Sequence, residues 1–392
     1  MKRLALVAVA AGALLAAPES GVQEGFDHFY NLEYEEAVAV FRKLIAAHPD
    51  NADYRNHLAE AILYRELFRV GALESELVSG TNPFLRRPKL NPSPEVEEEF
   101  VNAIATAMSL CEQRLKENAN DTAALYTLGV AYGLRANYNF IVRKAWMSAL
   151  RDATRSRKLH SKVVRLDPAN IDARMVPAIH EYVVGSLPWY YRLLGFLAGF
   201  RGNKQEGIRT LELVARRGER NRDDARILLC VVYRRERQPA KAVPLLKGLI
   251  SDFPRNYLLR MELVQMYSDL GEEDNAMAVI REMERLKRDR APGYDRMPMY
   301  RIWYTRGTLQ FWYGHLEAAR ADFENIIAVE HQLNLHTAQL AWFRLGQIYD
   351  LLGERDAAVK AYRKVIRYAA DSLRARQAKR YLKKPCTVAT RK

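Results

Sequence analysis

The 392-residue sequence predicts an all-α fold, a right-handed α-solenoid of helix-turn-helix repeats that ends in a capping helix. Two observations predict this fold. Large apolar and small residues recur with a period of about 34 residues, and each period holds two helical patterns separated by a turn. Apolar residues make up 49% of the chain and charged residues 28%, a balance typical of a folded protein with a sufficient core.

The clearest repeat spans residues 339–372. The residues that fix its register are Trp342, Leu345, Gly346 and Tyr349 in the first helix, and Ala358, Tyr362 and Val365 in the second. Large residues at these positions fill the space between two helices, and small residues let the two backbones approach closely. The pattern resembles the tetratricopeptide repeat superfamily. That resemblance implies the solenoid fold and leaves the function open.

The same register returns along the chain. It fits residues 223–256, continues from Tyr257, and returns at Tyr300, where Arg306 occupies the usual leucine position. Weaker matches follow Gly25 and Thr122. The expected segments are a signal peptide at 1–20, N-terminal repeats at 21–69, an inserted loop at 70–95, an irregular helical segment with an elongated helix at 96–187, a repeat array at 188–372, a capping helix at 373–384 and a flexible tail at 385–392.

The N-terminus has the features of a secretory signal. Lys2 and Arg3 precede an apolar run over residues 4–15, which contains a small-x-small cleavage pattern at residues 11–13. No later stretch reaches the length of a membrane-spanning helix. We therefore expect an exported protein of the periplasm or cell envelope, with an uncleaved anchor as the alternative.

A second resemblance is local. Residues 186–211 are similar to a Leu-Pro, Gly-Phe-x-Gly-Asp-Arg, Gly-Leu pattern in a repeat family that includes the inclusion-body clearance protein and outer-membrane tetratricopeptide proteins. Asn203 and Lys204 replace the Asp-Arg of that pattern. The resemblance bears on architecture only. It agrees with a divergent repeat whose first helix begins at Pro188.

Catalytic and metal-binding motifs are not recognisable in the sequence. It contains no nucleophile elbow, no zinc-protease helix motif, no phosphate-binding Gly-rich loop and no paired-cysteine metal motif. Cys111, Cys230 and Cys386 are odd in number and far apart, so no disulfide framework is expected. We expect a non-enzymatic protein without a cofactor.

The resemblance implies a concave groove lined by the first helices of the repeats. Aromatic residues and Arg are common among the side chains that the register directs into it, and these types are enriched at protein interfaces. The candidate partner-binding residues are Arg192, Phe196, Arg234, Arg235, Gln265, Arg301, Tyr304, Thr308, Phe311, Trp312, Phe343 and Gln347. A terminal or internal helix that fills the groove is the alternative. The Lys and Asn positions that hold chaperone tails in this superfamily are not occupied by those residues.

The elongated helix carries a row of cations. Arg151, Arg155, Lys158, Lys162 and Arg165 follow at spacings of four, three, four and three residues, which places them on one face. The chain has a net charge of +14, which favours an acidic partner, although solubility alone is a sufficient explanation. These cations are candidates for contact with an anionic surface, and the aromatic stretch at 189–200 is either a further contact or core.

Two hypotheses for the function follow from these patterns. The first is a scaffold that binds a protein or peptide partner in its groove. The alternative is a peripheral envelope protein that contacts anionic lipid or glycan through the basic helix and the aromatic segment. Nucleic acid is not expected as a partner of an exported chain. An enzyme subunit with an unrecognised site is a remote third reading.

Overall fold

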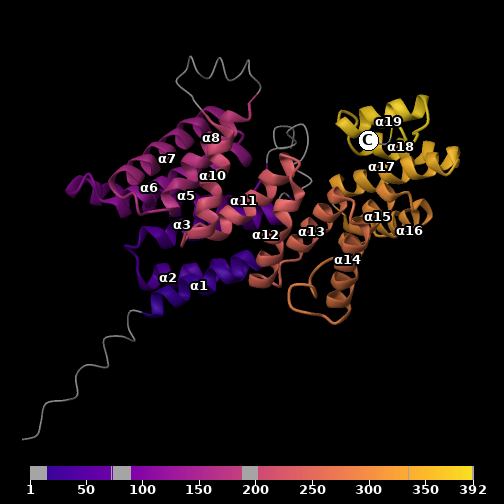
Figure 1. Ribbon diagram of the computed structural model, residues 1–392. Coiled ribbons are helices and arrows are strands. Elements are labelled where there is room, and N and C mark those ends of the chain that lie inside the picture. The colour runs from indigo at the N-terminus through magenta and orange to yellow at the C-terminus, as the bar shows by residue number, and fades with distance from the viewer. Residues whose placement is uncertain (1–15, 72, 74–89, 188–201, 334, 391–392) are drawn as a thin grey trace, which may run out of the picture. The chain divides into compact units, whose positions relative to one another are not determined.

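A computed structural model describes residues 16–71, 73, 90–187, 202–333 and 335–390. The described residues form helices joined by turns and loops, without strands (Figure 1). None of these helices combines the length and the apolar composition needed to cross a bilayer. The helices fall into two compact units, and the boundary between them in the sequence lies between Pro254 and Arg255.

The described residues of the N-terminal unit form five helix pairs. Its helices are α1 (Ala16–Tyr30), α2 (Tyr34–Ala47), α3 (Ala52–Arg69), α5 (Pro94–Glu117), α6 (Thr122–Ile141), α7 (Trp146–Leu166), α8 (Met175–Gly185), α10 (Lys204–Arg217), α11 (Arg222–Arg235) and α12 (Pro239–Asp252), with a 3₁₀ turn at Asp172–Arg174. Consecutive members of this series pack as pairs, from α1 with α2 to α11 with α12. Each pair corresponds to one helix-turn-helix repeat.

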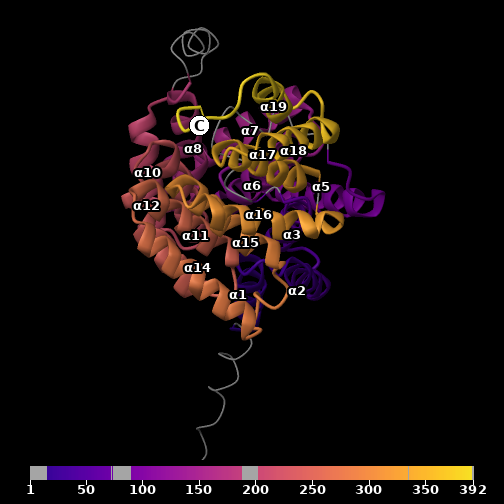
Figure 2. The same cartoon turned by 90° about the vertical axis from the view of Figure 1, so that its right-hand side faces the viewer.

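The C-terminal unit contains three pairs and a last helix. Its helices are α13 (Tyr257–Leu270), α14 (Glu273–Arg288), α15 (Met299–Tyr313), α16 (Leu316–Ala328), α17 (Leu335–Leu351), α18 (Arg355–Tyr368) and α19 (Leu373–Lys383), with a 3₁₀ turn at Glu330–Gln332. In both views α19 lies beside α17 and α18, at the end of the stack away from α15 and α16 (Figures 1 and 2). The expected capping helix is therefore α19. All-α solenoid architecture is confirmed.

The repeat signature explains how the two helices of a pair pack. Ala358, Tyr362 and Val365 are fully buried in the cluster that joins α17, α18 and α19. Leu345 is fully buried in the cluster that joins α15, α16, α17 and α18. A Cβ on Gly346 would lie 2.5 Å from the Tyr362 ring, so only glycine allows α17 and α18 to approach this closely.

Helix α10 belongs to the repeat that is expected to begin at Pro188. Among the described helices, α8 and α11 pack against it, and α8 ends before Pro188. Gly207 of α10 faces α8 so closely that a Cβ there would lie 2.6 Å from the Tyr182 backbone nitrogen and 2.7 Å from the Ala178 carbonyl oxygen. The expected first helix of the repeat, in residues 188–201, lies outside the described residues.

Other expected segments fall partly outside the described residues. Most of the signal peptide and of the inserted loop lies there, although α1 already begins at Ala16. The segment expected to be irregular, 96–187, forms helices of three successive pairs, of which α7 has 21 residues. The expected flexible tail is positioned against the last repeat as far as Thr390.

Candidate functional site

The first helices of the C-terminal unit carry most of the candidate partner-binding residues. Gln265 lies on α13, five candidates lie on α15, and Phe343 and Gln347 lie on α17. Gln265, Tyr304 and Trp312 are half-buried and keep part of their side chains at the surface. The Gln265 amide donates a hydrogen bond to Asp269, at 2.7 Å.

Five of these candidates are buried, which corrects their assignment to an open groove. Arg301, Thr308, Phe311, Phe343 and Gln347 are each less than 10% exposed. Adjacent first helices pack side by side in a stack of repeats, so side chains directed toward the next repeat are covered by it. Phe311 is an example, because it belongs to the core cluster that joins α15, α16 and α17.

Arginine side chains stack on aromatic rings between successive first helices. The Arg301 guanidinium lies 5.5 Å from the Tyr257 ring centroid and 5.7 Å from that of Tyr300. The Arg344 guanidinium lies 4.7 Å from the Phe311 centroid and 5.0 Å from that of Trp312. Stacking holds each planar cation in a fixed orientation.

Arg344 is a residue of this surface that the sequence analysis missed. It is half-buried, and its guanidinium donates a hydrogen bond to the Gln347 side chain at 2.9 Å. Its register position, next to Phe343, was not among those expected to face the groove. The sequence signal that identifies it is an arginine between two apolar core residues, Phe343 and Leu345, of a first helix. An arginine at such a position needs a partner, for example an aromatic ring.

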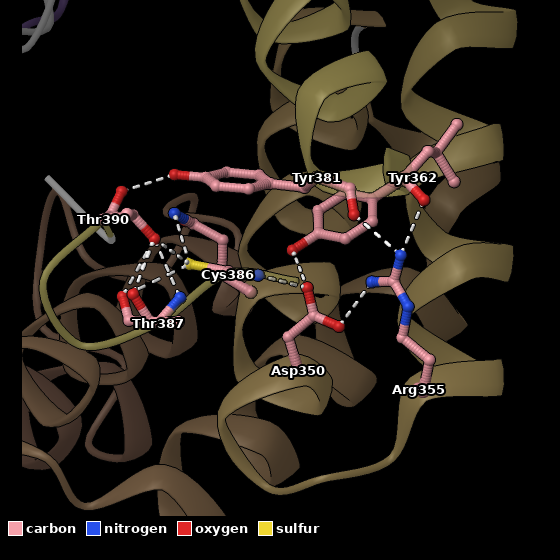
Figure 3. Close-up of polar contacts among 9 residues, drawn as sticks. Asp350, Arg355, Tyr362, Tyr381, Cys386, Thr387 and Thr390 are labelled. Atoms are coloured by element: carbon pink, nitrogen blue, oxygen red, sulfur yellow. Dashed lines mark hydrogen bonds and ion pairs between the residues drawn. The ribbon is translucent and has the colours of Figure 1, made fainter. Parts of the chain in front are cut away.

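The chain's own C-terminal segment lies on the face of α17. Residues 385–387 follow α19 without helical structure, and the buried Cys386 packs against Phe343 and Tyr381. The Cys386 backbone N–H donates to the Asp350 carboxylate at 2.7 Å, and the Gln347 amide donates to the Cys386 sulfur at 3.7 Å (Figure 3). The register directs Gln347 and Asp350 toward the expected groove, and Cys386 of the C-terminal segment contacts both side chains.

Asp350 joins this segment to the last repeat (Figure 3). Its side chain is 0% exposed. It accepts hydrogen bonds from the Tyr362 hydroxyl at 2.9 Å and from Arg355 at 2.7 Å. Burial, followed by the Asp350 charge, raises the pKa of Tyr362 far above its ordinary value, which keeps that hydroxyl a donor. The carboxylate therefore holds an extended backbone through one N–H and is itself held by two side chains.

Four groove candidates belong to the N-terminal unit. Arg234 and Arg235 lie at the end of α11, where Arg234 is half-buried and Arg235 is exposed. The Arg235 guanidinium lies 5.9 Å from the Tyr182 ring centroid. Arg192 and Phe196 lie outside the described residues.

The five cations of α7 lie on its solvent side. Arg151, Arg155, Lys158 and Arg165 are exposed, and Lys162 is half-buried. Arg155 stacks over the Tyr132 ring, with 5.4 Å to its centroid, and Lys162 donates to the Ala119 carbonyl at 2.6 Å. The helix therefore presents these side chains together, as the spacing had predicted.

A cleft of about 440 Å³ lies among α2, α3 and α5. Its lining includes Arg42, Glu95, Glu98 and Glu99. Glu99 accepts two hydrogen bonds from Arg42, both at 2.7 Å, which joins α5 to α2. This ion pair links the two helices across the cleft.

Titratable side chains gather where the first and last pairs of the N-terminal unit meet. Tyr30 of α1 stacks near Phe253, with ring centroids 4.7 Å apart, and forms a hydrogen bond with Asp224 of α11. Burial and the Asp224 charge raise the pKa of Glu60 to about 8, and burial raises that of Asp224 to about 6. No group of three or more His, Cys, Asp or Glu in the described part of the chain has the arrangement of a metal site.

Comparison with known proteins matches two segments of the chain to one kind of repeat. A tetratricopeptide repeat model matches residues 340–372, and a second one matches residues 23–66. No curated protein sequence matches the chain.

Similar folds occur among solved structures. Yeast Tom70 has a TM-score of 0.40 and 12% identity, over 93% of this chain and 95% of that one. The human IFIT1 dimer with m7Gppp-AAAA has a TM-score of 0.46 and 15% identity, over 93% of this chain and 80% of that one. YrrB, described as a TPR protein with an unusual peptide-binding site, has a TM-score of 0.32 and 17% identity, over 69% of this chain and 97% of that one. All three TM-scores lie below 0.5, so no property of these proteins is carried over to this chain. With a family match in each compact unit, this chain is a protein of the tetratricopeptide repeat superfamily.

Proposed function

We propose that this protein is a non-enzymatic scaffold that binds an extended segment of a partner protein on the face formed by α15 and α17. Tetratricopeptide repeats are typical of protein–protein interaction scaffolds. The observation that carries the proposal is the position of residues 385–387 on α17. A carboxylate holds their backbone, and an amide and an aromatic ring contact a small side chain.

The same face offers further anchors beyond the C-terminal segment. Tyr304 and Trp312 are half-buried aromatic side chains, and Arg344 is held over the Trp312 ring by stacking. Aromatic and arginine side chains whose conformation is already fixed lose little entropy on binding, which makes them effective anchors. A partner segment with an acidic residue near small apolar ones fits this combination.

We also propose that the protein is exported to the periplasm or cell envelope. Lys2, Arg3 and the apolar run at residues 4–15 support this proposal. Determination of the mature N-terminus by mass spectrometry tests it. A start between residues 14 and 21 is expected, and a chain that retains Met1 in the cytoplasm contradicts it.

Photocrosslinking in the native cells tests the scaffold function. A photoreactive residue replaces Tyr304 in one variant and Lys360, an exposed residue of the second helix α18, in the matched control. One dominant protein adduct at position 304, absent at 360, is expected. Equal labelling at both positions, or no protein adduct at 304, contradicts a partner site on this face.

A further inference from the structure

The solvent side of α7 is a cationic surface without compensating carboxylates. None of Arg151, Arg155, Lys158, Lys162 and Arg165 forms an ion pair with any described residue. The helix contains one acidic residue, Asp152, which is buried and pairs with Arg135 at 2.8 Å. Like charges in a row repel one another, so contact with an anionic surface lowers the free energy of this surface.

The N-terminal end of the same helix exposes apolar side chains. Trp146 is 40% exposed, Met147 71% and Leu150 49%. The Trp146 ring packs edge-on against Phe140, with centroids 4.7 Å apart, which fixes its position. Four of the nine large apolar side chains exposed in the described part of the chain belong to α7. Such a concentration marks an interaction surface.

The next helix adds two exposed apolar side chains. Helix α8 follows α7 and packs against it, with His180 of α8 near Arg157 in the middle of α7. Val183 and Leu187, at the C-terminal end of α8, are 48% and 40% exposed. Two helices joined in this way run in opposite directions, and α8 has 11 residues against the 21 of α7, so this end of α8 lies beside the middle of α7.

These two properties distinguish the possible partners. The cations span residues 151–165, about 21 Å along a helix at 1.5 Å per residue. A bilayer with anionic lipids offers phosphates for such a row and an acyl region for apolar side chains beside it, and Trp is enriched at that boundary. An acidic protein surface matches the charges but gives Met147 and Leu150 no apolar environment.

We propose that α7, with the end of α8, forms a surface that lies on an anionic lipid bilayer. The cations of α7 contact lipid phosphates. Trp146, Met147 and Leu150 enter the boundary between headgroups and acyl chains. This surface belongs to the N-terminal unit and involves none of the residues proposed to bind a partner segment, so one function does not depend on the other.

Vesicle sedimentation of the full chain tests the proposal. Phosphatidylcholine vesicles with phosphatidylglycerol are expected to bind the protein, and vesicles of phosphatidylcholine alone are not. The combined changes Arg151→Glu, Lys158→Glu and Arg165→Glu are expected to lower the partition coefficient by about tenfold or more. The changes Lys360→Glu, Arg363→Glu and Arg367→Glu alter the net charge equally on exposed residues of α18 and are expected to retain most of the binding.

A second variant tests the apolar contact. Met147→Ser with Leu150→Ser leaves every cation in place and is expected to keep binding at low salt and lose it as salt is raised. Circular dichroism confirms that each variant is folded. Three results overturn the proposal: no binding to anionic vesicles, an equal loss in the α7 and α18 charge variants, or a serine variant that binds like the unchanged protein at every salt concentration.

Discussion

Asp322→Ala is expected to lower the free energy of unfolding of the C-terminal unit by roughly 3–5 kcal/mol. Asp322 is 2% exposed and accepts two hydrogen bonds from Arg306, at 2.8 and 2.5 Å. Arg306 also pairs with Glu284 of the preceding helix. It stands where the repeat usually has leucine, so this ion-pair network replaces an apolar contact. Removal of Asp322 leaves a half-buried cation with one carboxylate.

Urea unfolding, followed by circular dichroism, measures this effect. The double variant Arg306→Leu with Asp322→Leu removes both charges and restores the apolar type of the repeat. It is expected to recover most of the lost stability, because the cost comes from an uncompensated charge. A loss below about 1 kcal/mol for Asp322→Ala, the value of an exposed pair, contradicts the account.

The second large effect expected is a pH dependence that originates at Glu60. Burial and Asp224 raise the pKa of Glu60 to about 8 in the folded protein, from its usual 4.5. The folded state therefore binds more protons than the unfolded state between these values, and stability falls as pH rises through this range. From pH 6.5 to pH 8 the loss is expected to be about 1–2 kcal/mol.

Neighbouring groups act mainly below this interval. Burial raises the pKa of Asp224 from its usual 3.8 to about 6, so this group lowers the stability of the folded protein as pH rises between these two values. Burial lowers the pKa of His57 from its usual 6.5 to about 4, so this group raises the stability of the folded protein as pH rises between these two values. Glu60 therefore dominates among these three from pH 6.5 to 8.

Thermal unfolding at pH 6.5 and at pH 8 measures the effect of Glu60. Glu60→Gln is expected to remove most of the difference between the two, and Glu112→Gln, at an exposed position of α5, is expected to leave it unchanged. An unchanged pH dependence in Glu60→Gln shows that another group is responsible.

The fold was predictable where the repeat signature is dense. Leu345, Ala358, Tyr362 and Val365 specified a helix pair because volumes at these positions admit one arrangement. The packing of α8 against α10 was not predicted, because the residues after Pro188 fit the signature. The sequence does not tell which of two apolar stretches lies against Gly207. That choice depends on how closely the two backbones approach, and a Cβ on Gly207 would lie only 2.6–2.7 Å from backbone atoms of α8.

The binding surfaces were less predictable than the fold. The row of cations on α7 follows from helical spacing alone. The exposure of Met147 beside it did not, because an apolar residue at the start of a helix is usually core. On α17 the register selected Gln347 as a groove position, but this side chain is buried, and Cys386 of the C-terminal segment that contacts it lies 39 residues away in sequence. Such contacts arise from tertiary packing, which one-dimensional periodicity does not encode.

The binding of polypeptide by the α17 face is the central claim, and one titration tests it most directly. A chain that ends at Lys384 is mixed with a fluorescent peptide of residues 385–392, and fluorescence anisotropy follows binding. Because a short tether supplies an effective concentration of the order of 1 mM, occupancy within the intact chain requires a Kd tighter than about 1 mM.

Saturable binding of the peptide to the shortened chain is expected. Asp350→Ala is expected to abolish it, and Asp356→Ala, at an exposed position of α18, is expected to preserve it. Circular dichroism of the shortened chain and of both variants confirms that they are folded. No saturation up to about 1 mM, or equal binding by the Asp350→Ala variant, would show that this face does not bind extended polypeptide through the contacts described.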